Sequence, residues 1–233
     1  MLYEVHNRPL PVLVCKLNQG ESIECQQGAM SWMTPTMSMQ TGLGSGGKGV
    51  MGALGKMAKS AFTGESIFRN TYTAAGGPGE IAFASTFPGD IIAFDVGQTQ
   101  LIAQKSAYFA NTPGVQMEVA FTGGKKLSGI FGGEGLIMQK FTGNGTVFLE
   151  IDGCVYNYVL GPGESMLVDT GYLAAMEATC TMEVETVKGL GNILAGGEGL
   201  FNTKVTGPGK IWLQTMPTIA LAGALRPYIP TGS

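Results

Sequence analysis

Charged side chains are scarce in this chain. Asp, Glu, Lys and Arg make up 13% of its 233 residues, about half the share of an average soluble protein. Disordered chains show the opposite composition, with high charge and few β-branched or aromatic residues, so that class is excluded. The net charge of −3 argues against a broad nucleic-acid surface, which needs clustered Lys and Arg. A weakly charged surface suits burial against another subunit and predicts an oligomer.

Histidine is almost absent, because His6 is the single one in the sequence. A cupin-type metal site on a β-fold needs several imidazoles and a carboxylate, and is therefore excluded. The sequence also lacks G-x-S-x-G, H-E-x-x-H and the P-loop, since Lys48 is followed by Gly49. We predict that the chain is not an enzyme and has no catalytic residue, cofactor or metal, and that His6 is an ordinary, partly exposed side chain.

Paired cysteine motifs and long apolar runs are missing as well. Cys15, Cys25, Cys154 and Cys180 contain no C-x-x-C spacing, which predicts buried free thiols in a reducing compartment. No stretch of about 18 apolar residues is present, so no transmembrane helix is expected. The first residues lack a basic segment followed by an apolar one, which argues against a signal peptide. Together these features predict a cytoplasmic protein.

Glycine, in contrast, is abundant. The 37 glycines are about twice the ordinary share and lie between apolar runs, as in proteins with many tight turns. Gly-Asn-Gly at 143–145 and Gly-Pro-Gly at 207–209 are examples. Alternating apolar residues between such turns indicate strands. Strands are predicted near residues 11–17, 36–41, 91–96, 115–121, 154–160 and 180–187.

An internal repeat organises these strands. Residues 132–150 and 196–214 are identical at ten of nineteen positions without a gap, and a weaker copy begins at residue 64. Each copy predicts five or six short strands that close into a jelly-roll-like unit, with a β-propeller as the second possibility. We predict one all-β domain with pseudo-threefold symmetry. Its parts are residues 3–86 with a glycine-rich insertion at 42–62, residues 87–152, residues 153–217, and a C-terminal tail at 218–233.

Two kinds of charged residue recur with the repeat. Glu65, Glu134 and Glu198 could line a channel that binds cations, or accept backbone N–H bonds in tight glycine turns. We favour the structural interpretation because the pattern is tied to neighbouring glycines. Lys140 and Lys204 could form a basic track for RNA, but without clustered aromatic residues a solvated strand face is favoured.

The insertion contains a basic amphipathic segment at residues 48–62. At helical spacing its two faces separate apolar from basic side chains, a form that lies on membranes or binds a partner groove. The apolar face carries Met51, Leu54, Met57 and Phe62, and the basic face carries Lys48, Lys56 and Lys59. Packing against its own assembly and a disordered loop remain alternatives. The apolar run 219–225 predicts a short C-terminal helix packed in the core.

The repeated G-G-E-G-[LI] followed by T-G-x-G, together with Arg226–Pro230, resembles the altered inheritance of mitochondria protein family. The resemblance covers about residues 3–230. It implies a fold like the tryptophan RNA-binding attenuation protein (TRAP-like), with three short double-stranded β-helix units per chain. It also implies homotrimers, in which nine units form a closed ring. Eukaryotic members are linked to mitochondrial biogenesis and inner-membrane organisation, whereas bacterial members are mostly proteins of unknown function.

Three hypotheses of function follow. The first is a non-enzymatic, oligomeric β-ring scaffold that contacts proteins or a membrane surface, with residues 48–62 as the contact element. The second is an RNA-binding ring, which rests on fold analogy and is opposed by the acidic composition. The third is a small-molecule-binding protein with pockets between units.

Overall fold

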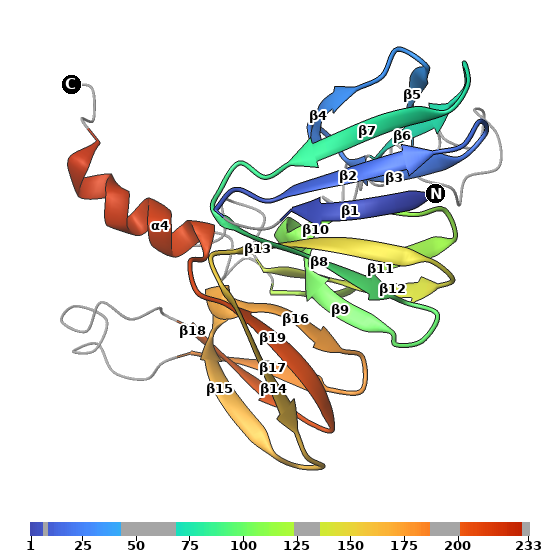
Figure 1. Cartoon of the computed structure of the whole chain (residues 1–233). Helices are drawn as coiled ribbons and strands as arrows, with labels where there is room; N and C mark the ends of the chain where they lie inside the picture. Colours follow the sequence, from blue (N-terminus) through green and yellow to red (C-terminus); the bar gives the residue numbers. More distant parts are fainter. Residues whose placement is uncertain (7–8, 43–68, 124–135, 187–200, 230–233) are drawn as a thin grey trace.

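The structure is a computed structural model that describes residues 1–6, 9–42, 69–123, 136–186 and 201–229. This part of the chain contains nineteen β-strands, one α-helix and three short 3-10 helices. The prediction of an all-β protein is confirmed, and every strand pairing in it is antiparallel. Figure 1 shows the strands following one another in three tiers, in chain order, with the helix projecting away from them.

The first tier runs from the N-terminus to residue 84. Its strands are β1 (Leu2–His6), β2 (Val12–Leu17), β3 (Ser22–Gln26), β4 (Met30–Met33), β5 (Met37–Gly42), β6 (Arg69–Ala74) and β7 (Gly79–Ala84). The second tier contains β8 (Gly89–Asp95), β9 (Leu101–Gln104), η1 (Lys105–Ala107), β10 (Tyr108–Asn111), β11 (Val115–Thr122), β12 (Ile137–Gly143) and β13 (Thr146–Asp152). The third contains β14 (Val155–Leu160), β15 (Ser165–Asp169), η2 (Thr170–Tyr172), β16 (Leu173–Glu177), β17 (Thr181–Thr186), β18 (Phe201–Thr206) and β19 (Gly209–Gln214), and is followed by α4 (Thr218–Leu225) and η3 (Arg226–Tyr228). All six strands predicted from alternation are present.

The same strand pairings recur in each tier. In the first, β7 pairs with β2 and β4, and β6 pairs with β3 and β5. In the second, β13 pairs with β8 and β10, and β12 pairs with β9 and β11. In the third, β19 pairs with β14 and β16, and β18 pairs with β15 and β17. A register shift also interrupts β4, β10 and β16 at the same place. Two residues in different tiers are therefore called equivalent when they lie on corresponding strands and pair with corresponding positions of the neighbouring strand.

The tiers are packed on one another by apolar side chains. Alternation predicts one inward face of β13, with Val147, Leu149 and Ile151, and these three residues are buried. Phe148, on the opposite face, is buried as well, because it belongs to a core cluster shared with the first tier. Trp212 of β19 likewise joins a cluster dominated by the second tier. Burial on both faces explains why these strands are almost continuously apolar.

A glycine turn illustrates how tightly the tiers are closed. Gly209 begins β19 with φ of +146°, a conformation that L side chains rarely adopt. A Cβ atom at this position would lie 2.6 Å from Cys180 Sγ. Gly145, which immediately precedes β13, has the same φ. The predicted Gly-x-Gly turns are therefore needed for both backbone conformation and space.

The C-terminal helix corrects one prediction. Helix α4 forms where the apolar run predicts it, but none of its residues is buried, so the predicted core packing is wrong. Its first residue is held by Asp152, whose Oδ2 accepts hydrogen bonds from Thr218 N at 3.1 Å and Oγ1 at 2.6 Å. The rest of the helix points away from the tiers (Figure 1). An apolar run thus specified the helix but not a partner for it.

Within the described residues, no helix is long and apolar enough to cross a membrane.

Three of the four cysteines and the histidine lie where the sequence predicts them. All four cysteines are free, and Cys15, Cys25 and Cys180 are buried, but Cys154 is exposed. Burial raises the pKa of Cys15 and Cys25 to about 12, which makes both thiols inert at neutral pH. His6 is exposed at the edge strand β1, 3.6 Å from the Glu4 carboxylate, which agrees with an ordinary surface side chain.

Candidate functional site

The sequence-predicted interaction residues lie outside the described residues. These are Lys48, Met51, Leu54, Lys56, Met57, Lys59 and Phe62 of the insertion, and the recurring Glu65, Glu134 and Glu198. They fall in the segments that connect β5 to β6, β11 to β12, and β17 to β18. The described strands on either side of each segment pair with one another.

The recurring lysines lie on strands opposite acidic residues. Lys140 of β12 is the cross-strand partner of Glu118 on β11, and Lys204 of β18 is the partner of Glu183 on β17. Cross-strand neighbours of opposite charge lie close enough to attract one another. The arrangement is a balanced strand surface rather than a basic track.

An open cleft of about 370 Å³ lies at one end of the first tier. Its walls include Leu2, Lys16, Thr34 and Glu80. The Lys16 ammonium donates a hydrogen bond of 3.1 Å to Glu4, and both side chains are more than half exposed. Small-molecule sites are usually enclosed and mostly apolar, so this solvated cleft gives little support to a ligand-binding role.

The two junctions between tiers are the most distinctive features of the molecule. Strand β3 of the first tier pairs with β10 of the second, so that Cys25 lies opposite Ala110. Strand β9 of the second tier pairs with β16 of the third, so that Ala103 lies opposite Ala175. Each junction thereby joins half of one tier to half of the next in a six-stranded sheet.

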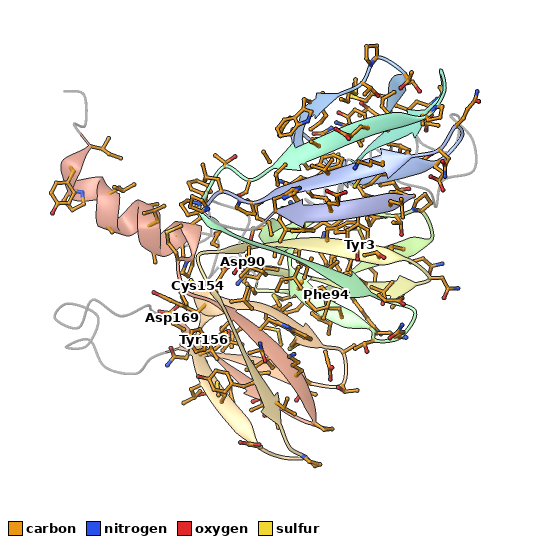
Figure 2. All side chains as sticks on the ribbon, viewed as in Figure 1. Tyr3, Asp90, Phe94, Cys154, Tyr156 and Asp169 are labelled. Carbon is orange, nitrogen blue, oxygen red and sulfur yellow. The ribbon has the colours of Figure 1, made fainter. Side chains whose placement is uncertain are left out.

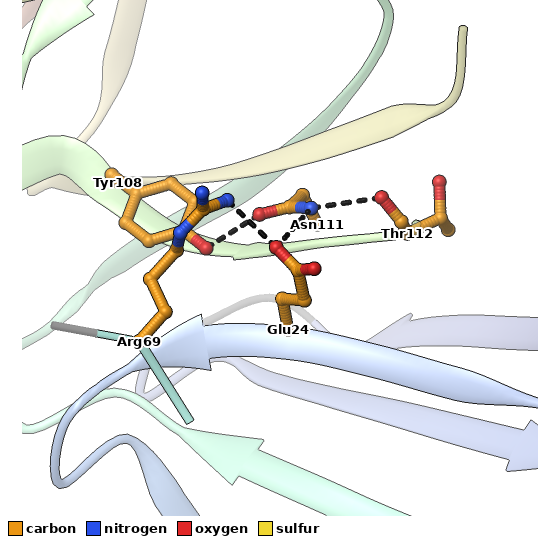
Figure 3. Close-up of polar contacts among 5 residues, drawn as sticks. All are labelled: Glu24, Arg69, Tyr108, Asn111 and Thr112. Carbon is orange, nitrogen blue, oxygen red and sulfur yellow. Dashed lines mark hydrogen bonds and ion pairs between the residues drawn. The ribbon is translucent and has the colours of Figure 1, made fainter. Parts of the chain in front are cut away.

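The first junction contains a buried polar network (Figure 3). Arg69 Nη1 donates a 2.7 Å hydrogen bond to Glu24 Oε2, and both residues come from the first tier. From the second tier, Asn111 Nδ2 donates to the same oxygen at 3.4 Å and to the Thr112 carbonyl at 2.8 Å. The Tyr108 hydroxyl donates to Asn111 Oδ1 at 2.6 Å. Burial raises the pKa of this phenol above its ordinary value.

The second junction replaces this network with apolar side chains. By their pairings, Glu24 and Arg69 are equivalent to Ile102 and Met138. Asn111 is equivalent to Met176, which lies opposite Ile102 across the junction. The same backbone joint is thus filled once by hydrogen-bonded charges and once by hydrophobic packing.

At each junction, an aromatic side chain of one tier packs against an aromatic side chain of the next tier. Tyr3 of β1 meets Phe148 of β13 edge-on, with ring centroids 4.9 Å apart. Phe94 of β8 meets Trp212 of β19 in the same way, also at 4.9 Å. Such edge-to-face pairs add about 0.5–1.5 kcal/mol beyond burial of their area. Figure 2 shows Tyr3 and Phe94 at successive levels of the stack.

Two strands that correspond to the junction strands, β4 of the first tier and β15 of the third, are paired on one side only among the described residues. Strand β4 is the edge of the first sheet and β15 is the edge of the last. Their outer surfaces carry large exposed hydrophobic residues, including Trp32 and Met33 on β4 and Leu167 on β15. The neighbouring strand β14 exposes Tyr156 (Figure 2) and Tyr158. Sequence reasoning missed these surfaces, because alternation alone does not distinguish a buried edge from an open one.

Comparison with known proteins places the chain among proteins of unknown function. The model of the mitochondrial biogenesis AIM24 family matches residues 3–216. An uncharacterized protein of Streptococcus pyogenes serotype M6, M6_Spy0233, is 30% identical over 225 residues, which is 96% of this chain and 88% of that protein. The crystal structure of protein SPYM3_0169 from Streptococcus pyogenes is similar with a TM-score of 0.78 at 25% identity, and the match covers 98% of this chain and 99% of that one.

Proposed function

This chain belongs to the mitochondrial biogenesis AIM24 family. On that basis we propose that it is a non-enzymatic scaffold protein, in which three copies of the chain form a closed homotrimeric β-ring. In this proposal its three tiers are TRAP-like units, and the assembled ring contacts proteins or a membrane surface.

The order of strands in the sheets carries the proposal. The two junction sheets have the orders β5-β6-β3-β10-β13-β8 and β11-β12-β9-β16-β19-β14. The chain ends contribute the two missing halves, β17-β18-β15 and β4-β7-β2, the latter extended by β1. Joining β15 of one copy to β4 of another completes a third sheet of the same order.

Such a contact is head-to-tail, because it uses two different surfaces of the chain. Contacts of this kind close into rings when the rotation between copies allows it. Closure also protects the two edges, since open strands with exposed hydrophobic residues invite uncontrolled pairing. Three copies are the number that the family resemblance implies.

The polar chemistry of the chain supports a structural role. Glu24 and Asn111 are almost completely buried in a packed junction, where a substrate could not reach them. The balanced pairs of Lys140 with Glu118 and Lys204 with Glu183 disfavour RNA as the partner, since RNA binding relies on uncompensated positive charge.

Light scattering coupled to size exclusion tests the assembly. At micromolar concentration we expect a mass three times the 24.3 kDa of one chain. A monomeric mass would refute the ring. The same run with anionic liposomes, on the full chain and on a variant lacking residues 44–60, tests the contact surface. Binding that disappears with the deletion would support a membrane scaffold, whereas no binding by the intact ring would direct the search to protein partners.

A further inference from the structure

The two junctions within the chain define what a third junction requires. Across them, Glu24 lies opposite Asn111 and Ile102 lies opposite Met176. On β15 the residue equivalent to Glu24 and Ile102 is Leu167, the partner of Lys204. On β4 the residue equivalent to Asn111 is Met33, since Asn111 pairs with Val147 and Met33 with Ile81. Val147 and Ile81 each lie two residues after the turn glycine, Gly145 or Gly79. Both residues at the chain ends are large, apolar and exposed.

The preceding rung shows an exchange of large and small residues. Ala110 lies opposite Phe148, and Ala175 lies opposite Trp212. In the first tier the order is reversed, with Trp32 on β4 opposite Ala82 on β7. Each tier therefore has one aromatic side chain at this rung.

The surroundings of these three aromatic side chains differ. Phe148 and Trp212 are 0% and 8% exposed, whereas Trp32 is 51% exposed. The first two are covered by an aromatic residue of the preceding tier, Tyr3 or Phe94. Trp32 belongs to the first tier, which no other tier precedes among the described residues.

The third tier has an aromatic residue at the covering position. Tyr158 lies opposite Ile211 as Phe94 lies opposite Val147, so the two are equivalent. Tyr3 occupies the same rung in the first tier, opposite Cys15. Tyr158 is 44% exposed and belongs to the third tier, which no other tier follows among the described residues.

From these equivalences we infer that Tyr158 of one copy packs edge-on against Trp32 of the next, above a β15–β4 ladder in which Leu167 faces Met33. The register is the one repeated at both internal junctions, and it also sets Val168 opposite Trp32. This inference rests on the proposed ring and names its contact surface. Because Leu167 and Met33 are both apolar, the junction resembles the second, hydrophobic one rather than the first.

Cysteine cross-linking tests the register. Met33→Cys/Leu167→Cys is made with Cys154→Ser, which removes the exposed native thiol. Directly opposite strand residues have Cβ atoms close enough for a disulfide after small adjustments. Mild oxidation is expected to convert most of the protein into covalently closed trimers on non-reducing gels. The matched control, Met33→Cys/Val168→Cys, is shifted by one residue, so its side chains leave opposite faces of the sheet and cross-linking should drop to background.

Light scattering on the reduced proteins separates the possible failures. A trimer that cross-links at 33 and 167, but not at 33 and 168, supports the inference. A trimer that does not cross-link at 33 and 167 overturns this register and leaves the proposed ring standing. A monomer overturns both. Far-UV circular dichroism on each reduced variant verifies that it is folded.

Tryptophan fluorescence tests the aromatic contact independently. In a Trp212→Phe background, Trp32 is the remaining tryptophan, and its emission should shift to longer wavelength when the oligomer is diluted into monomers. Adding Tyr158→Ala should move that transition to higher protein concentration, whereas Val159→Ala, at an exposed position on the other face of β14, should move it less. Truncation after Pro217 removes α4, a second apolar element among the described residues that could cover Trp32. A shift of the Trp32 spectrum on truncation, with none for Tyr158→Ala, would contradict the assigned contact.

Discussion

The buried pair of Glu24 and Arg69 offers a quantitative test of how the first junction is held. Replacing Glu24 by Ile leaves the Arg69 guanidinium buried without its carboxylate partner, at side-chain exposures of 2% and 10% in the intact pair. Breaking a buried ion pair in this way costs about 3–5 kcal/mol. Asn111 also loses one of its hydrogen-bond acceptors. We therefore expect Glu24→Ile to lower the free energy of unfolding by about 4 kcal/mol.

The second junction supplies the compensating substitutions. Changing Glu24, Arg69, Asn111 and Tyr108 together to Ile, Met, Met and Leu reproduces the side chains at the equivalent positions Ile102, Met138, Met176 and Leu173. Replacing a whole buried ionic cluster by apolar residues of similar volume is often neutral or stabilising, by about 1–4 kcal/mol. The fourfold variant should therefore recover most or all of the stability lost in Glu24→Ile.

Urea unfolding followed by circular dichroism measures both variants. Protein concentration is held constant, because association contributes to the apparent stability of an oligomer. Glu118→Ile, at an exposed position of β11, is the matched control and should change stability by about 0.5 kcal/mol or less. If the fourfold variant were as unstable as Glu24→Ile, the equivalence of the two junctions would be refuted.

Three further predictions follow from single sites. Cys154 should be the one thiol per chain that reacts rapidly with a maleimide in the native state, with the other three reacting only in urea, because they are buried; mass spectrometry after brief labelling counts them. Gly209→Ala should destabilise the protein by about 1–3 kcal/mol, because its Cβ would lie 2.6 Å from Cys180 Sγ. Gly223→Ala in α4 has open space around its Cβ and should not destabilise the protein. The midpoints of urea unfolding of the two variants test this difference. Burial raises the pKa of Glu150 above its ordinary value of 4.5, so the stability linked to its protonated form is present at low pH and lost as pH rises through the raised pKa. Glu150→Gln should remove this loss in thermal melts between pH 4 and 8. An unchanged pH profile of stability in the variant would contradict the prediction.

The sequence was sufficient to predict the strands but not how tiers join. Alternation along Val115–Thr122 is regular, with buried or half-buried residues at every second position, so the strand β11 could be predicted directly. The apolar run in α4 similarly predicted a helix. Both signals are local, because side-chain periodicity depends only on backbone geometry.

The junction residues could not be predicted, because their roles depend on register between distant strands. Glu24 and Arg69 are 45 residues apart, and nothing near either of them indicates a buried ion pair. Trp32 also lies in a strand of ordinary appearance, and its exposure follows from the position of β4 at a sheet edge. The insertion 48–62 and the recurring Glu65, Glu134 and Glu198 lie outside the described part of the chain, so their roles stay predictions.

The exchange of large and small residues between β4 and β7 bears on how duplicated sequences diverge. Close packing constrains the combined volume of two facing side chains more strongly than the identity of either one. Ala175 with Trp212 and Trp32 with Ala82 are two solutions with the aromatic ring on opposite strands. A change at one position becomes tolerable once its facing neighbour has changed in the other direction, so neutral drift proceeds through coupled pairs. Diverged copies of this repeat should therefore be recognisable by covariation between facing strands after their position-by-position similarity has disappeared.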